Sequence, residues 1–407
     1  MRVLLACGPM QPEPGGVPLP GLGLGAADVT EALASGWARQ RPQDVLTLLP
    51  LPDGGAGSAQ AVTPARVRSR EALAAPGPLG DVREVDLLGL EVAPAAPGGS
   101  RNGRMSASRS WLLDAARLTS LPAQAGLAAQ EAREGTTAGL GLVIAEALRR
   151  TRPGDTLVVG MARAAVHDGG AGLIEALGGV VAARRLTQGR DIVLALADGV
   201  SLGGLSGAGQ GLSALTDLTA RQCQDLDRGA CATASRLAAE LARARPAELE
   251  VRAAADGEQS RERGLTVSSW GTGAAGGAAL VLRALGARAL PGPRVMAALL
   301  GLEAEAWSQD LLVTAQGEAY DVLADSVPAV VGEAAVREAL PAVLVTGRSL
   351  VPRGELAQAG IVSLTSLQQG SADTPWDEGG VPGIVRRLEA MGRRLARTWS
   401  RSAPPTG

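Results

Sequence analysis

The sequence has 407 residues, of which 46% are hydrophobic, and a formal net charge of −2. This length predicts two or three domains with sizeable cores, and the balanced charge without a basic tract argues against nucleic-acid binding. All 39 basic residues are arginine, which excludes a P-loop, a lysine phosphate clamp and a lysine Schiff base. Three scattered cysteines and one histidine argue against a disulfide framework and a zinc site.

The amino-terminal segment is typical of a first strand rather than of a leader peptide. Its apolar run ends at Cys7 and is followed at once by Gly8 and Pro9. No stretch of the sequence approaches the roughly 20 uninterrupted apolar residues that a membrane-spanning helix requires. We therefore expect a cytoplasmic protein without membrane contact.

Apolar runs suited to strands alternate along the chain with runs of helical periodicity, which predicts an α/β fold with parallel sheets. The predicted strands, in chain order, are 3–6, 44–51, 85–92, 156–160, 192–196, 311–313, 343–345 and 361–364. The predicted helices lie near 29–37, 111–118, 140–150, 172–177, 232–245, 278–285 and 384–399. Segments 94–104 and 248–263 are expected to be an exposed loop and a solvated, charge-rich segment.

Three aspartates, Asp53, Asp168 and Asp198, each follow a predicted strand and each precede glycine. Ligands of open α/β sheets bind beyond the carboxyl ends of the strands, where glycines let backbone N–H groups approach phosphate oxygens. An aspartate there can hold Mg²⁺ or accept a hydroxyl proton. A single Asp-Gly pair more often forms a turn or a helix cap, but three such pairs at strand ends favour a shared binding cleft.

The segment Gly271–Gly276 fits the G-x-G-x-x-G pattern of dinucleotide-binding turns. The acidic residue expected about 20 residues further on is absent, because position 296 is methionine. We therefore interpret this segment as a glycine-rich turn that enters a helix.

The order of these motifs resembles that of the glycerate kinase family over most of the chain. Asp53–Ser58 is similar to the family's Asp-Gly-Gly-Glu-Gly-Thr, and His167–Gly172 to its Asn-Asp-Gly-Gly-x-Gly. Further matches, in chain order, are Gly77–Gly80, Leu113–Ala116, Thr136–Gly141, Ala197–Asp198, Gly273–Gly277 and Gly347–Leu350. The collinear order is more specific than any one of these motifs.

Several residues depart from the family pattern. The first strand ends at Cys7–Met10, where the family has an aspartate and a lysine. Gln316 and Glu318 stand where the family has glutamate and arginine, so the second change reverses a charge. Phosphoryl transfer depends on neutralising phosphate charge. Arg163 and Arg348 are the candidates to supply that charge through guanidinium groups.

The resemblance implies two α/β domains with a cleft between them. A discontinuous Rossmann-like domain would comprise 1–70 and 281–407, and a second domain 71–280. It further implies a phosphotransferase that uses ATP and Mg²⁺ to phosphorylate glycerate. Asp168 and Asp198 would be catalytic and would hold Mg²⁺, with Asp53 in support. Substrate or phosphate would be bound by Gly54, Gly55, Gly57, Ser58, Gly169, Gly170, Gly276, Gly277, Arg163 and Arg348.

Two functions remain open at the level of sequence. The surviving Asp-Gly sites favour an ATP-dependent kinase for glycerate or another small hydroxy acid. The missing lysines and the changes at Gln316 and Glu318 favour a catalytically inactive homologue retained for binding or assembly. The sequence indicates neither the oligomeric state nor which carbon of the acid would be phosphorylated.

Overall fold

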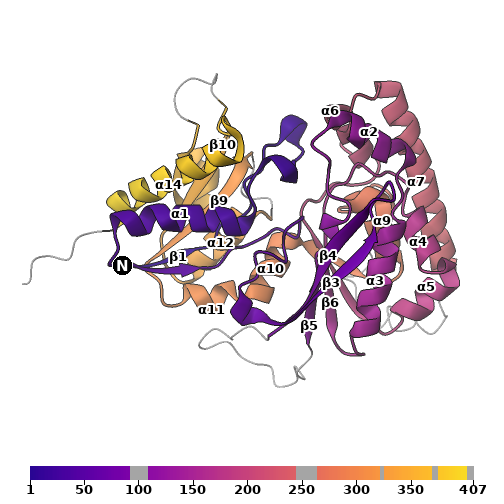
Figure 1. Cartoon of the computed structure of the whole chain (residues 1–407), viewed down its shortest axis with the longest axis horizontal. Coiled ribbons are helices and arrows are strands. Elements are labelled where there is room, and N and C mark those ends of the chain that lie inside the picture. The colour runs from indigo at the N-terminus through magenta and orange to yellow at the C-terminus, as the bar shows by residue number, and fades with distance from the viewer. Residues whose placement is uncertain (92–108, 244–263, 321–324, 369–374, 401–407) are drawn as a thin grey trace, which may run out of the picture. The chain divides into compact units, whose positions relative to one another are not determined.

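The computed structural model describes the chain except residues 92–108, 244–263, 321–324, 369–374 and 401–407 (Figure 1). Contacts divide the chain into two compact units. The first comprises Met1–Arg68, Leu90–Ala107 and Pro291–Gly407, and the second comprises Ser69–Gly89 and Ser108–Leu290. Each unit contains one sheet and its helices. The expectation of two α/β domains is confirmed.

The sheet of the first unit has five strands, and all of its recorded strand pairs are parallel. In spatial order they are β11 (Ile361–Ser366), β10 (Ala342–Ser349), β9 (Leu311–Ala319), β1 (Arg2–Leu5) and β2 (Val45–Leu48). The chain passes from β1 to β2 on one side and later continues at β9 on the other side. The strand order therefore reverses between β1 and β9, which is where open α/β sheets form a ligand-binding crevice.

Helices pack closely against this first sheet. Helices α1 (Ala26–Gln40) and α14 (Gly380–Trp399) form one core with β1, β9 and β10. They cross at Gly36 and Gly392, where an added Cβ would lie 2.0 Å and 2.2 Å from backbone oxygens of the partner helix. Helix α12 (Val327–Arg337) packs against β9 and β10. The other helices of this unit are α10 (Gly292–Leu300), α11 (Leu302–Ala306) and α13 (Arg353–Gln358), with short 3₁₀ turns at Pro14–Gly16, Pro20–Leu22 and Pro64–Arg66.

The sheet of the second unit has six strands, of which the three neighbouring strands β5, β6 and β7 run parallel. In spatial order they are β3 (Val67–Pro76), β4 (Val82–Leu90), β5 (Ser110–Leu113), β6 (Thr156–Met161), β7 (Asp191–Leu196) and β8 (Arg288–Pro291). Its helices are α2 (Ala125–Glu134), α3 (Ala138–Arg150), α4 (Ala171–Ala176), α5 (Gly179–Thr187), α6 (Ala208–Leu215), α7 (Ala220–Arg243) and α9 (Ala278–Ala284), with 3₁₀ turns at Ala115–Arg117 and Ala274–Gly277.

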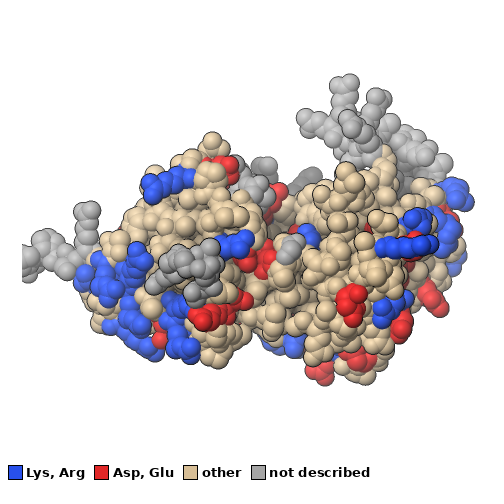
Figure 2. Space-filling model, turned by 90° about the horizontal axis from the view of Figure 1, so that it is seen from above, with Lys and Arg blue, Asp and Glu red and all other residues tan. Residues whose placement is uncertain are grey.

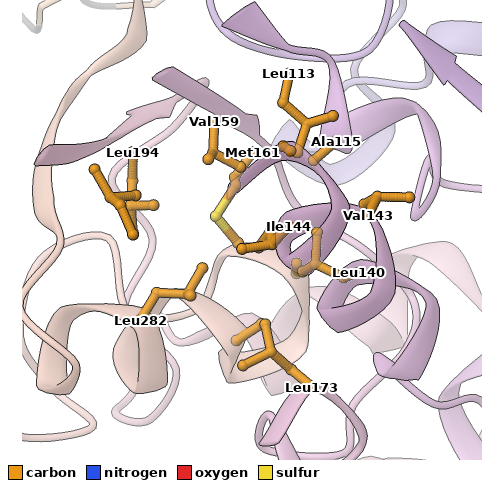
Figure 3. Close-up of a cluster of buried hydrophobic side chains, with 14 of the residues drawn as sticks. Leu113, Ala115, Leu140, Val143, Ile144, Val159, Met161, Leu173, Leu194 and Leu282 are labelled. Atoms are coloured by element: carbon orange, nitrogen blue, oxygen red, sulfur yellow. The ribbon is translucent and has the colours of Figure 1, made fainter. Parts of the chain in front are cut away.

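The core of the second unit is built mainly from aliphatic side chains, and the sequence has no phenylalanine. Figure 3 shows side chains of β5, β6, β7, α3, α4 and α9 meeting in one buried cluster around Met161. The parallel strands and their helices are thereby fixed to each other, and the loops that follow β6 and β7 start from a rigid base.

One predicted element has the wrong type. The segment 111–118 was expected to be helical, but Ser110–Leu113 forms the buried strand β5 and only a short 3₁₀ turn follows it. A short continuous apolar run fits a buried strand as well as a buried helix, so periodicity does not separate the two. Helix α7 also begins earlier than predicted, at Ala220. The expectations for 94–104 and 248–263 lie outside the described residues.

Surface charge is mixed on the face shown in Figure 2, where arginines (blue) and carboxylates (red) are interspersed. Many exposed arginines pair with carboxylates, for example Arg294 with Glu333 at 2.7 Å. Within the described part of the chain, no helix is long and apolar enough to cross a membrane.

Candidate functional site

Arg163 and Asp198 lie beyond the carboxyl ends of neighbouring parallel strands. Met161 of β6 is aligned with Leu196 of β7, and Arg163 and Asp198 each come two residues later. The Nε of Arg163 donates to Oδ2 of Asp198 at 3.0 Å, and their side chains are 24% and 23% exposed. Oδ1 of Asp198 accepts a hydrogen bond from the backbone N–H of Val200 at 3.0 Å. The sheet register thus forms a partly accessible ion pair at the ligand-binding edge.

Asp168 is held much more fully. Its carboxylate accepts hydrogen bonds from the backbone N–H groups of Thr137, Gly170 and Gly172 at 2.8, 2.9 and 3.0 Å. The Thr137 hydroxyl also lies 2.9 Å from Oδ2, while its oxygen accepts from the backbone N–H of Leu173. These contacts join the start of α3 to the start of α4. Most of the acceptor capacity of the carboxylate is therefore used within the fold.

The glycines near Asp168 permit two loops to pack against each other. The backbone N–H of Gly169 donates to the Gly276 carbonyl at 2.9 Å. Gly276 has a φ of +62°, and an added Cβ there would lie 2.1 Å from the carbonyl oxygen of Val166. An added Cβ on Gly170 would lie 2.6 Å from Val281. These glycines, like Gly277, are buried and serve close packing between the loops.

The Asp53 loop of the first unit is a tight turn beyond β2. Oδ1 of Asp53 accepts from the N–H of Gly55 at 2.8 Å, and the hydroxyl of Ser58 donates to the Gly55 carbonyl at 2.6 Å. Gly54 and Gly57 both have a φ of +92°, which a residue with a side chain rarely adopts. Ser58 is only 1% exposed. Its hydroxyl therefore stabilises the turn.

Arg348 belongs to a second cluster of the first unit, at the ends of β9 and β10. Its Nε lies 3.6 Å from Oε2 of Glu318, and its Nη2 donates to the Tyr320 hydroxyl at 3.3 Å. Glu318 also accepts from the hydroxyl of Tyr320 and, at 3.4 Å, from the indole N–H of Trp376. Burial and the hydrogen bond to Glu318 raise the pKa of Tyr320 to about 12. This group lines a cavity of about 640 Å³.

A comparison with protein families identifies the family of this chain. The model of the glycerate kinase family matches residues 23–400. The chain belongs to the glycerate kinase family. The resemblance seen in the order of the sequence motifs is thereby confirmed.

Other comparisons are consistent with that family. Two uncharacterized proteins, of Mycobacterium bovis and Mycobacterium tuberculosis, are each 29% identical over 347 residues, which is 85% of this chain and 81% of theirs. A crystal structure described provisionally as glycerate kinase 2 of Salmonella typhimurium LT2 has a TM-score of 0.61 at 22% identity and covers 98% of both chains. At that identity the similarity shows the shared fold.

In this glycerate kinase family chain, the predicted site residues fall into the two units. Asp168 and Asp198, with Arg163 and the glycines of their loops, belong to the second unit. The Asp53 loop and Arg348 belong to the first unit. The structure pairs Arg163 with Asp198 and joins the loops of Gly169 and Gly276, whereas Asp53 and Arg348 are each positioned by neighbours within the first unit.

Three residues near these loops were not proposed from sequence as functional. Thr137, which holds Asp168, lies in the Thr136–Gly141 motif that carried the family resemblance. Trp270 packs on the backbone of Gly199, where an added Cβ would lie 2.0 Å from the indole nitrogen, yet it is 44% exposed. Asp227 lies 3.5 Å from the ring of the buried His167. The last two belong to distant segments, so no local sequence pattern pointed to them.

A protein-held metal ion does not fit the described residues well. They contain no group of three or more His, Cys, Asp or Glu side chains that could hold one. Asp168 directs its oxygens at backbone N–H groups, and Asp198 is in contact with Arg163.

Proposed function

We propose that this protein transfers the γ-phosphoryl group of ATP to a hydroxyl of glycerate or a similar small hydroxy acid. The observation that carries the proposal is the Arg163–Asp198 pair, 3.0 Å apart and partly exposed at the carboxyl edge of β6 and β7. Family membership makes phosphoryl transfer the expected chemistry, and this edge is where α/β sheets bind their ligands.

Each partner of the pair has a distinct role in this proposal. The guanidinium of Arg163 stabilises negative charge on the phosphoryl oxygens, a task for which its planar donors are suited. The carboxylate of Asp198 orients the acceptor hydroxyl and takes its proton as the new O–P bond forms. The bond between the γ-phosphorus and the bridging oxygen breaks, and ADP leaves with the electron pair. The N–H of Val200 keeps Asp198 in place.

Asp168 has a positioning role in the proposal rather than the catalytic role expected from its motif. Its carboxylate holds the starts of α3 and α4 through Thr137, Gly170 and Gly172. These contacts fix the loop that leads from Arg163 to α4. Loss of Asp168 would therefore reduce turnover through loss of structure.

The proposal is tested by measuring ADP formation from ATP and Mg²⁺ with and without D-glycerate. The wild-type protein is expected to show glycerate-dependent turnover, and Asp198→Asn and Arg163→Gln are expected to reduce kcat by about 100-fold or more. Arg149→Gln is the matched control, because Arg149 is an exposed arginine on α3 whose recorded ionic contact is with Glu146. Full activity of Asp198→Asn would refute the role of the pair. A panel of other small hydroxy acids identifies the preferred acceptor.

A catalytically inactive homologue is the second candidate, and one observation favours it. Both candidate cations already contact carboxylates, Arg163 with Asp198 and Arg348 with Glu318, so their charge is partly neutralised. If folded protein forms no ADP with any hydroxy acid but binds glycerate in calorimetry, the protein is a catalytically inactive homologue that binds glycerate, and the kinase proposal is refuted.

A further inference from the structure

The first unit contains a cavity of about 640 Å³ that the phosphoryl-transfer proposal does not use. Its lining includes Glu13, Leu22, Glu318, Tyr320, Arg348 and Trp376. All of these residues belong to the first unit, so the cavity lies within one compact part of the chain. Its volume lies within the range of small-molecule sites.

The cavity occupies the ligand-binding position of the first sheet. Glu318 and Tyr320 lie at the end of β9, and the segment that contains Glu13 and Leu22 follows β1. Gly317 brings this segment onto β9, since an added Cβ there would lie 2.5 Å from the carbonyl oxygen of Gln11. The cavity is therefore formed where the strand order reverses between β1 and β9.

The charges of the lining disfavour a polyanion inside the cavity. The lining contains three carboxylates, of Glu13, Glu318 and Asp377, and one guanidinium, of Arg348. One of them, Glu318, has a side chain only 11% exposed, so its charge is poorly screened by water. A ligand that presents hydroxyl groups rather than phosphates to Glu318 fits this lining.

An organic cation would satisfy the same charges, but the aromatic residues argue against it. The guanidinium of Arg348 lies 5.7 Å from the centre of the Tyr320 ring and so already interacts with that ring. The indole of Trp376 is 3% exposed and packs on the backbone of Gly347. The Trp376 ring is therefore closed to a ligand ammonium group, and the Tyr320 ring, which is 40% exposed, already has a cation beside it.

We infer that this cavity binds the nucleoside part of the nucleotide, with Glu318 accepting a hydrogen bond from a ribose hydroxyl. A carboxylate is an acceptor suited to a ribose hydroxyl, and this one lies at the crevice where the strand order of the sheet reverses. The indole N–H of Trp376 and the hydroxyl of Tyr320 hold Glu318 in place and leave it acceptor capacity for a further donor. The phosphates lie outside the carboxylate-lined part. The choice of a nucleoside rests on the proposed use of ATP.

The test measures binding of adenosine, 2′-deoxyadenosine and 3′-deoxyadenosine to the whole chain by calorimetry, without any hydroxy acid. Adenosine is expected to bind at least about tenfold more tightly than one of the two deoxy analogues, the ratio that one charge-assisted hydrogen bond gives. The ligand comparison uses wild-type protein, so it does not depend on a variant that folds. Equal affinity for all three nucleosides, or no adenosine binding by folded protein, would overturn the inference.

Variants test whether Glu318 causes the difference in affinity between adenosine and its deoxy analogues. Glu318→Leu, with its fold checked by circular dichroism, is expected to bring the ratio close to one. Glu338→Gln is the control, because Glu338 belongs to the same unit and lies outside the cavity lining. A ratio unchanged in Glu318→Leu would refute the contact.

The same measurements separate this inference from the proposed function. Ribose-selective binding without glycerate-dependent ADP formation would support the nucleoside site in the cavity and refute the proposed kinase activity. Glycerate-dependent formation of the nucleoside diphosphate that is equally efficient with ATP and with both deoxy-ATP analogues would support the kinase activity and overturn the ribose contact in the cavity.

Discussion

The carboxyl edges of the two sheets use acidic residues in opposite ways. In the second unit, the carboxylate of Asp168 accepts hydrogen bonds from backbone N–H groups, which occupy most of its acceptor positions. In the first unit, Glu318 is held by side chains and lines a cavity. The first arrangement fixes a loop, and the second places a carboxylate at the cavity that we propose as a nucleoside site. An acidic residue at a strand end therefore acquires its role from its donors, whatever its motif.

The same contrast exists within the second unit. Asp168 accepts from four donor groups, whereas Asp198 accepts from Arg163 and Val200. The contrast predicts that stability depends mainly on Asp168 and turnover mainly on Asp198. Substitutions at the two positions separate these effects.

The largest stability change is expected for Asp168→Ala. Its removal leaves several partly buried N–H groups without their acceptor, which costs about 4 kcal/mol or more in the free energy of unfolding. Urea unfolding of Asp168→Ala and Asp198→Ala gives the comparison, and Asp198→Ala should cost less than about 1.5 kcal/mol. Equal losses of stability would contradict the claim that Asp168, and not Asp198, mainly stabilises the fold.

A smaller loss is expected for Gly276→Ala. The new Cβ would lie 2.1 Å from the Val166 carbonyl in a backbone with a φ of +62°, which predicts a loss of about 2–3 kcal/mol. Gly126→Ala is the control, because Gly126 lies in α2 and an added Cβ there meets no atom within 4 Å. Thermal unfolding should show Gly126→Ala as neutral or slightly stabilising. A neutral Gly276→Ala would mean that the loops do not pack as tightly as described.

The smallest effect concerns Asp155, which joins the starts of β5 and β6. Burial alone would raise its pKa, but hydrogen bonds from the N–H of Arg152 and the indole of Trp111 outweigh burial and lower it from 3.8. A lowered pKa means that ionised Asp155 stabilises the fold above about pH 4. This contribution is lost as the pH falls through the folded-state value.

Asp155→Asn should therefore cost about 1–2 kcal/mol near pH 7. The difference from wild type should shrink as the pH falls below 3.8. Unfolding curves between pH 7 and pH 3 measure both quantities. A difference that grows on acidification would contradict the role of the ionised carboxylate.

The sequence predicted the family, the α/β class and the loops that carry Asp53, Asp168 and Asp198, because each follows a strand and precedes glycine. It did not predict what each carboxylate faces. The donors of Asp168 include Thr137, which is 31 residues away, and Trp376 reaches Glu318 across 58 residues. The strand β5 was missed because its apolar run is too short to show a period. The domain boundaries and the roles of the site residues stay predictions.

The most direct test of the account is glycerate-dependent ADP formation by wild-type protein, Asp198→Asn and Arg163→Gln at equal folded concentration. The wild type is expected to turn over ATP, and both variants are expected to lose about 100-fold or more of this activity while their melting temperatures stay close to that of the wild type. Turnover that survives in both variants, or none in folded wild-type protein, would contradict this expectation.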